Sequence, residues 1–159
     1  MKLLEIIEYL EIAVPLSYQE SYDNSGLLVG DQNMNIKSVL TCLDCTEEII
    51  EEAISRKCNL IISHHPIIFN SIKKITNSSY NERVIYKAIK NDIAIYSMHT
   101  NLDNIDGGVS FIFSRKLGLL NSKILKQKDN TLTQLITYCP KKNVKQLQDA
   151  LFNIGAGQV

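Results

Sequence analysis

The sequence lacks any uninterrupted apolar stretch of about 18 residues, the length at which a membrane-spanning helix is suspected. It also lacks an excess of either charge, because 17 basic residues balance 17 acidic ones. Such a balance gives no bulk attraction to a nucleic acid or an anionic membrane, and no basic stretch is interleaved with aromatic residues. Internal repeats and low-complexity tracts are missing as well. We therefore expect a folded protein with neither a membrane nor a nucleic acid as its partner.

Cysteine is scarce, with four residues in 159, and its placement argues against a cysteine framework. Cys42 and Cys45 have the spacing of half a zinc or redox motif, but no second pair completes a four-sulfur site. All four cysteines lie within apolar runs, whereas a disulfide framework places them in loops. We expect buried thiols near a strand end and a reducing, cytoplasmic location.

Hydrophobic periodicity alternates between helices and strands. Residues 1–12 repeat apolar side chains at helical spacing between glutamates, which predicts an amphipathic helix and argues against a signal peptide. Short β-rich runs follow at 26–30, 39–43, 60–63 and 93–98. Three further helices are predicted to begin at Thr46, at Ser79 and at Asp106. Strands joined by helices through short connections predict the α/β class, with a parallel-sheet core and flanking helices.

The character of the sequence changes near residue 122. Residues 123–130 are polar and charged, which is typical of a linker, and a strand at 132–138 and a helix at 143–154 follow. One strand and one helix bury too little surface to form a domain. We therefore expect the sequence to be the front part of a longer protein.

Histidines and carboxylates follow the predicted strands where each strand ends. The first parallel strand is followed by Asp44, the second by His64 and His65, and the third by His99 and Asp103. In a parallel sheet these carboxyl ends share one edge, where ligands commonly bind. Imidazoles suit zinc, iron and similar ions, and a carboxylate can bridge two of them. The pattern predicts a metal site, and one that holds two ions.

Each of these residues also has a simpler interpretation. Asp103 could brace the helix that follows, although Asp106 is better placed to cap it, which leaves the two interpretations of Asp103 about even. His99 could act as a general base or support a metal ligand, or it could be a hydrogen-bonded loop histidine. Asp44 could belong to the N-cap region of the helix beginning at Thr46. For the adjacent pair His64 and His65, we favour a metal site.

Four runs in combination resemble a known family: YDNSGLLVG at 22–30, LDCT at 43–46, SHHP at 63–66 and MHTNLD at 98–103. This is the NGG-one-interacting-factor-like family, also described as GTP cyclohydrolase 1 type 2 homologues or dinuclear-metal-centre hexameric proteins. The likeness extends over essentially the whole chain. It implies that the sequence is an N-terminal fragment of a longer member.

The resemblance implies roles for individual residues. His64 and His65 would each bind one of two divalent ions per subunit, Asp103 would be a further ligand, and His99 would line the same cleft. The ions could be zinc, iron, manganese or cobalt. In the family a histidine and a glutamate near the C-terminus complete the site, but no histidine follows His99 here. The resemblance also implies that residues 1–122 are the N-terminal half of the metal-binding α/β domain. Residues 131–159 would then be the truncated beginning of a smaller, ferredoxin-like α+β inserted domain, and the full-length protein would form a homohexameric ring.

Three functions compete. The first is a metal-dependent hydrolase acting on a nucleotide-like or phosphorylated small molecule, in which His99 or an acidic neighbour moves protons. The second is a metal-stabilised hexameric scaffold or regulator without turnover. The third is an α/β binding module that needs no metal. The substrate is not indicated by any motif, because fold alone does not specify it.

Overall fold

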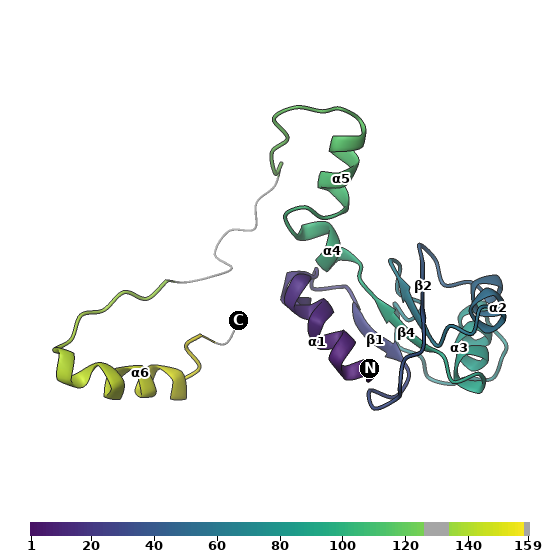
Figure 1. Ribbon diagram of the computed structural model, residues 1–159, viewed down its shortest axis with the longest axis horizontal. Coiled ribbons are helices and arrows are strands. Elements are labelled where there is room, and N and C mark those ends of the chain that lie inside the picture. The colour runs from purple at the N-terminus through teal and green to yellow at the C-terminus, as the bar shows by residue number, and fades with distance from the viewer. Residues whose placement is uncertain (126–133, 158–159) are drawn as a thin grey trace. The chain divides into compact units, whose positions relative to one another are not determined.

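The computed structural model describes residues 1–125 and 134–157. The chain divides into two compact units, Met1–Leu120 and Asn121–Val159, and each is described by itself. The first unit holds the whole sheet and every residue of the candidate site (Figure 1). Most of the predicted linker at 123–130 lies outside the described residues.

The first unit is built on a four-stranded sheet. Its strands are β1 (Gly26–Val29), β2 (Val39–Cys42), β3 (Leu60–Ser63) and β4 (Ala94–Ser97), in the order β1-β4-β3-β2. Strands β2, β3 and β4 are parallel, which confirms the predicted core. Strand β1 pairs with β4 in the antiparallel sense, a feature that the sequence analysis did not predict. The sheet is therefore mostly parallel, with one antiparallel edge strand.

Helices cover both faces of this sheet (Figure 1). Helix α1 (Leu3–Ala13) packs on one face, and α2 (Glu47–Ser55) and α3 (Tyr80–Lys90) pack on the other. The chain also forms α4 (Thr100–Asn104) and α5 (Val109–Lys116), of which α5 extends away from the sheet in Figure 1, and a short 3₁₀ turn η1 at Leu16–Tyr18. Ile61 and Ile95 of the sheet pack with α2 and α3, while their strand neighbours Leu60 and Ala94 pack with α1. Because consecutive strand residues point to opposite faces, both faces of the parallel strands must be apolar. This explains why these runs carry apolar side chains continuously.

Side-chain caps begin the two helices that follow β2 and β3, as predicted. The Thr46 hydroxyl accepts a hydrogen bond from the Ile49 amide at 3.2 Å, and the Ser79 hydroxyl accepts one from the Glu82 amide at 3.3 Å. Each cap satisfies a backbone N–H that has no partner inside the helix. These caps set where each helix begins, and therefore how long the preceding loop is.

We expect the Glu82 carboxylate to stabilise the folded protein in a way that depends on pH. Hydrogen bonds from the Thr76 amide and hydroxyl, both at 2.8 Å, and from Ser78 and Ser79 lower the pKa of Glu82 to about 2. A carboxyl whose pKa is depressed in the folded state stabilises that state above its unfolded pKa and loses this effect as the pH falls. We expect the contribution to disappear between pH 4.5 and about 2.

Urea unfolding at several pH values measures this effect. In the wild-type protein the unfolding midpoint should fall more steeply between pH 4.5 and about 2 than in Glu82→Gln. Glu8→Gln, which changes an exposed glutamate of α1, should keep the wild-type slope. Equal slopes in all three proteins would contradict the assignment.

The helix predicted to begin at Asp106 is the main error within the first unit. The structure forms two helices instead, and the second, α5, begins after Gly108 as its N-cap residue. A Cβ at Gly108 would lie 2.1 Å from the Leu102 carbonyl oxygen, so the chain turns too tightly there for a larger residue. The prediction followed the preference of aspartate for N-cap positions, whereas backbone crowding places the turn at glycine.

The second unit contains the predicted helix but no strand among its described residues. Helix α6 spans Val144–Asn153 after a 3₁₀ turn, η2, at Lys141–Asn143. The strand predicted at 132–138 is wrong for residues 134–138, which have no regular structure, while residues 132 and 133 lie outside the described part. A strand forms only where a partner accepts its backbone hydrogen bonds, and these described residues contain none. A ferredoxin-like domain stays a prediction.

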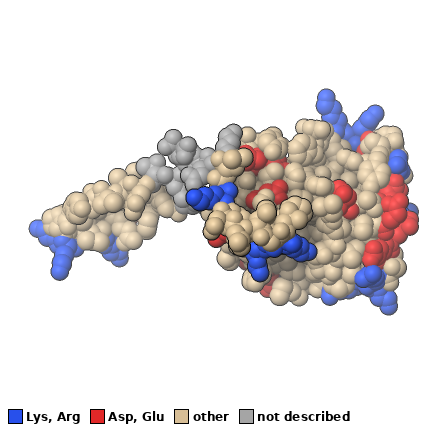
Figure 2. All heavy atoms as spheres, turned by 90° about the horizontal axis from the view of Figure 1, so that it is seen from above, with Lys and Arg blue, Asp and Glu red and all other residues tan. Residues whose placement is uncertain are grey.

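Neither the surface charge nor any described helix suggests a membrane partner. On the face drawn in Figure 2, Lys and Arg side chains are scattered, and acidic side chains gather at the end where Figure 1 places α2. Helix α2, with the sequence EEIIEEAIS, carries four glutamates. Among the described residues, no helix combines the length and the apolar character needed to cross a bilayer.

Candidate metal centre

The adjacent histidines leave the end of β3 on a well-held backbone. The His64 amide donates to the Cys42 carbonyl at 3.1 Å, so the pairing with β2 continues beyond the strand. Two serine hydroxyls hold the histidine carbonyls: Ser97 Oγ donates to His64 O at 2.8 Å, and Ser63 Oγ donates to His65 O at 3.0 Å. Both serines are buried. The turn that carries the two rings is therefore held by the sheet itself.

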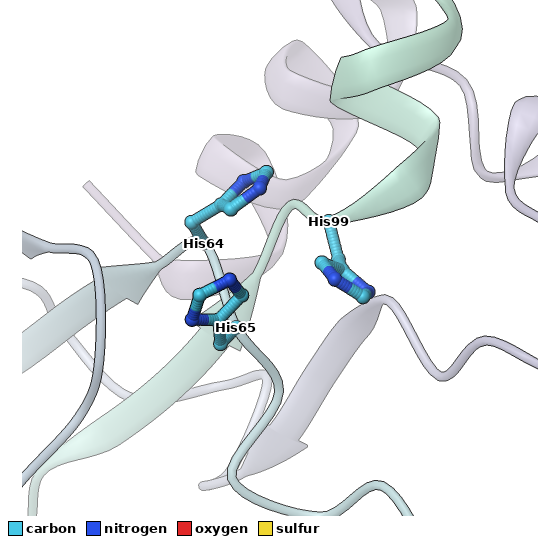
Figure 3. Close-up of side chains that lie close together, drawn as sticks. All are labelled: His64, His65 and His99. Atoms are coloured by element: carbon cyan, nitrogen blue, oxygen red, sulfur yellow. The ribbon is translucent and has the colours of Figure 1, made fainter. Parts of the chain in front are cut away.

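The chain's three histidines converge at this edge of the sheet. His64 and His65 follow β3, and His99 lies between β4 and α4 (Figure 3). The ring centroid of His64 lies 5.1 Å from that of His65 and 5.3 Å from that of His99, and the third distance is 5.5 Å. One nitrogen from each ring lies within 4.8 Å of the other two. These three imidazoles form a group that could hold a metal ion.

The spacing fits a divalent transition-metal ion. Zn–N bonds of about 2.0–2.1 Å place the nitrogens of a tetrahedral site about 3.4 Å apart, so modest ring rotations would bring these side chains onto one ion. Two ions about 3.5–4 Å apart would instead allow the rings to stay further separated. Imidazole and carboxylate ligands together suit zinc, iron, manganese or cobalt.

Each ring has its Nδ1 atom engaged by an acceptor outside the cluster. The three pairs are His64 Nδ1 with Met98 O at 2.8 Å, His65 Nδ1 with Asp44 Oδ1 at 2.7 Å, and His99 Nδ1 with Asp23 Oδ1 at 2.8 Å. A carbonyl or an ionised carboxylate only accepts hydrogen bonds, so each neutral ring must donate from a protonated Nδ1. Its proton-free Nε2 is then the atom left to bind an ion, as in metal sites whose histidines are oriented by outer hydrogen bonds.

Asp103 lies beside the cluster on α4. Its Oδ1 atom is 3.7 Å from His64 Nε2, and its side chain is 34% exposed. The Asp103 amide donates to the His99 carbonyl at 3.1 Å, so the helical turn places the carboxylate next to the histidines. An oxygen at this distance from an imidazole nitrogen can share an ion with it. The structure therefore places Asp103 beside His64, while the three side chains that lie close enough to share one ion are His64, His65 and His99. Metal binding by His64, His65 and Asp103 stays a prediction.

Asp44 does not cap the helix that follows it. Thr46 is the N-cap residue of α2, and the Asp44 carboxylate accepts a hydrogen bond from His65. The Asp44 and His65 side chains are 60% and 46% exposed, so water competes for this contact. Of the two interpretations that the sequence left open, the structure favours a carboxylate that orients a histidine.

Asp23 is the residue that the sequence analysis overlooked. Its side chain is fully buried and accepts a hydrogen bond from His99, which lies 76 positions away in the chain. Burial by itself would raise the pKa of Asp23, but hydrogen bonds from the Thr100 hydroxyl, from His99 and from the Asn24 and Thr100 amides outweigh it, so the pKa lies well below its ordinary value. Asp23 is therefore an ionised carboxylate. No local signal in the sequence pairs these distant residues.

A mostly parallel α/β sheet with imidazoles and carboxylates at its carboxyl edge defines an α/β protein with a candidate metal centre. A family model described as Duf34/NIF3 (NGG1p interacting factor 3) matches residues 1–157. The chain therefore belongs to the Duf34/NIF3 family, which confirms the resemblance found in the sequence.

Individual relatives support the same assignment. The chain is 40% identical to a Staphylococcus aureus (strain COL) protein named GTP cyclohydrolase 1 type 2 homolog, over 99% of this chain and 43% of that protein. A crystal structure of a Bacillus cereus protein related to NIF3 matches with a TM-score of 0.77 at 36% identity, over 100% of this chain and 44% of the other. A Staphylococcus aureus structure matches with a TM-score of 0.79 at 38% identity, over 99% of this chain and 45% of the other. The chain thus spans less than half the length of these relatives.

Proposed function

We propose that the protein is a divalent-metal-dependent hydrolase acting on a nucleotide-like or phosphorylated small molecule. One observation carries the proposal: three imidazoles, each held at Nδ1 from outside, gather at one edge of the sheet with one nitrogen of each ring within 4.8 Å of the other two. A satisfied core histidine needs no second ring near it, whereas this edge gathers every histidine of the chain together with Asp103. The name of the Staphylococcus aureus relative adds the substrate class, since a GTP cyclohydrolase acts on a nucleotide.

We assign each residue of the cluster a role from its position. In this proposal His64, His65 and Asp103 hold the ion, which supplies Lewis-acid activation of water and substrate oxygens. His99 is placed to accept a proton from the attacking water, because its Nδ1 is held by Asp23, its Nε2 is left for that proton, and its ring centroid lies 5.3 Å from that of His64.

Elemental analysis followed by a turnover screen tests this function. Protein purified without added metal should contain zinc, iron, manganese or cobalt, and should hydrolyse GTP, other nucleotides or simple phosphoesters in an EDTA-sensitive manner. His65→Gln should lose both the ion and the turnover, while Asp92→Asn, which changes an exposed residue outside the site, should keep both.

The outcomes separate the competing functions. Ion binding without turnover on any of these compounds would favour the metal-stabilised scaffold. Protein that purifies without an ion, and whose properties are unchanged in His65→Gln, would overturn the proposal in favour of a metal-free module.

Further features of the whole protein are also proposals. Two ions per subunit, a homohexameric ring and a cytoplasmic location follow from the family resemblance and from the cysteine content. The four cysteines lie among the described residues and are free thiols, which suits a reducing compartment. Light scattering coupled to size-exclusion chromatography measures the subunit number.

A further inference from the structure

A buried carboxylate stands behind one ring of the cluster. Asp23 lies in the loop between η1 and β1, and its side chain is 0% exposed, while the His99 ring beside it is 19% exposed. Burying an ionised carboxylate is strongly unfavourable unless hydrogen-bond donors replace the lost water. Both oxygens of Asp23 therefore need hydrogen-bond donors, and one of these donors is the ring of His99.

The two oxygens of this carboxylate have different partners. Oδ2 accepts from the Thr100 amide at 3.0 Å, from the Thr100 hydroxyl and from the Ser25 hydroxyl at 3.1 Å. Oδ1 accepts from the Asn24 amide at 2.7 Å and from His99 Nδ1 at 2.8 Å. Oδ2 therefore ties the loop to the start of α4, whereas Oδ1 is the oxygen that engages the imidazole.

The donors around Asp23 are themselves held in place. The Thr100 hydroxyl accepts from the Glu20 amide at 2.9 Å, so its own hydrogen is free to point at the carboxylate. The Ser25 hydroxyl likewise accepts from the His99 amide at 3.3 Å and donates to Asp23. A carboxylate surrounded by such donors has one position and one charge state. The imidazole it holds therefore has one orientation and one tautomer.

We infer that Asp23 is the positioning residue of His99. Its Oδ1 holds the ring in the Nδ1–H form, which leaves an unprotonated Nε2 in the cluster with His64 and His65, where it would serve a bound ion. This inference rests on the proposed metal site and adds a buried carboxylate that acts through His99. Asp44 makes the same kind of contact with His65, but in an exposed position where water competes. Asp23 therefore has the larger effect of the two.

Nitrogen-15 NMR of the histidine rings in the full chain reports the tautomer directly. With three histidines in the chain, the spectrum has three ring systems, which single His→Gln variants assign. In metal-free wild-type protein the His99 ring should show a protonated Nδ1, with its proton far downfield, and an unprotonated Nε2. In Asp23→Asn the His99 ring should become a mixture of tautomers, because an amide can donate as well as accept. The rings of His64 and His65 should keep their wild-type signals.

Metal affinity is the second measurement, made by chelator competition with Zn²⁺ alone. With Zn²⁺ alone and no substrate in the site, His99 is available as the third imidazole of the cluster. Losing an outer partner of such a ligand lowers metal affinity by about 10–100-fold, and we expect a loss in this range for Asp23→Asn. Asp44→Asn should lose less than about tenfold, since its contact is exposed. Asp92→Asn is the matched control, an exposed Asp→Asn change that should leave affinity unchanged.

These measurements separate an error in the role of Asp23 from an error in the proposed metal site. If Zn²⁺ shifts no ring of the wild-type protein, the proposed function fails, while the metal-free spectrum still tests Asp23. If His99 carries its proton on Nε2 in folded wild-type protein, or if Asp23→Asn leaves its tautomer and the Zn²⁺ affinity unchanged, the inference is wrong. Should Asp23→Asn not fold, the wild-type spectrum alone decides, because a missing downfield Nδ1 proton contradicts the assignment.

Discussion

Gly30→Ala is expected to destabilise the first unit by about 2–5 kcal/mol, the sum of backbone strain and overpacking. Gly30 follows β1 with a φ of +126°, a region that L residues rarely adopt. A Cβ there would lie 2.7 Å from the Ala94 Cβ and 3.0 Å from its Cα. Ala94 is 0% exposed and sits in the middle layer of the protein, so it has no space to retreat. Either the edge strand β1 or the start of β4 must move.

Urea unfolding followed by circular dichroism measures the change. Gly118→Ala is the matched control, since its φ of +71° is also positive but no atom lies within 4 Å of the added Cβ. That variant should lose only the left-handed backbone penalty, about 1–2 kcal/mol. Equal losses at the two positions would show that the contact with Ala94 does not matter, and would argue against the close packing of β1 on β4.

Replacing both His64 and His65 with alanine should abolish the stabilisation that an added ion gives. An ion that binds the folded chain raises its unfolding free energy by about 2.7 kcal/mol when its concentration is one hundred times its Kd. Both rings leave the same turn after β3, and together they supply two of the three imidazoles in the cluster. Without them, one imidazole and Asp103 remain, too few ligands for a tetrahedral ion.

Thermal unfolding with Zn²⁺ or with EDTA, in both proteins, gives the answer. The wild-type protein should melt at a higher temperature with Zn²⁺ than with EDTA, and the double variant should melt at the same temperature in both. Each protein serves as its own control, so any direct effect of losing the His64 contact with Met98 cancels. A double variant that keeps the ion-dependent shift would place the ion elsewhere.

Local chemistry accounts for what could be predicted along the chain. The strand at 60–63 and the caps at Thr46 and Ser79 were predicted correctly, because apolar runs and hydroxyl caps act on residues close in sequence. The gathering of His64 and His65 with His99 at one edge, with Asp103 beside His64, also followed from the sequence. It needed only one rule of topology, that the carboxyl ends of parallel strands share an edge.

Contacts between distant segments account for what was missed. The strand at 132–138, of which the structure describes 134–138, and the cap at Asp106 were predicted from local preferences alone. The strand failed because it has no partner among the described residues, and the cap moved because Gly108 passes close to the Leu102 carbonyl. In both cases a preference of one residue gave way to its three-dimensional surroundings.

The amino-acid sequence by itself determined the α/β class, the parallel core and the edge at which the histidines gather, since each depends on periodicity and on the order of strands. The tertiary structure alone decided that β1 lies antiparallel beside β4, and that a buried Asp23 holds His99. These depend on hydrogen bonds between residues far apart in the chain, and such bonds leave no pattern in the residues around either partner.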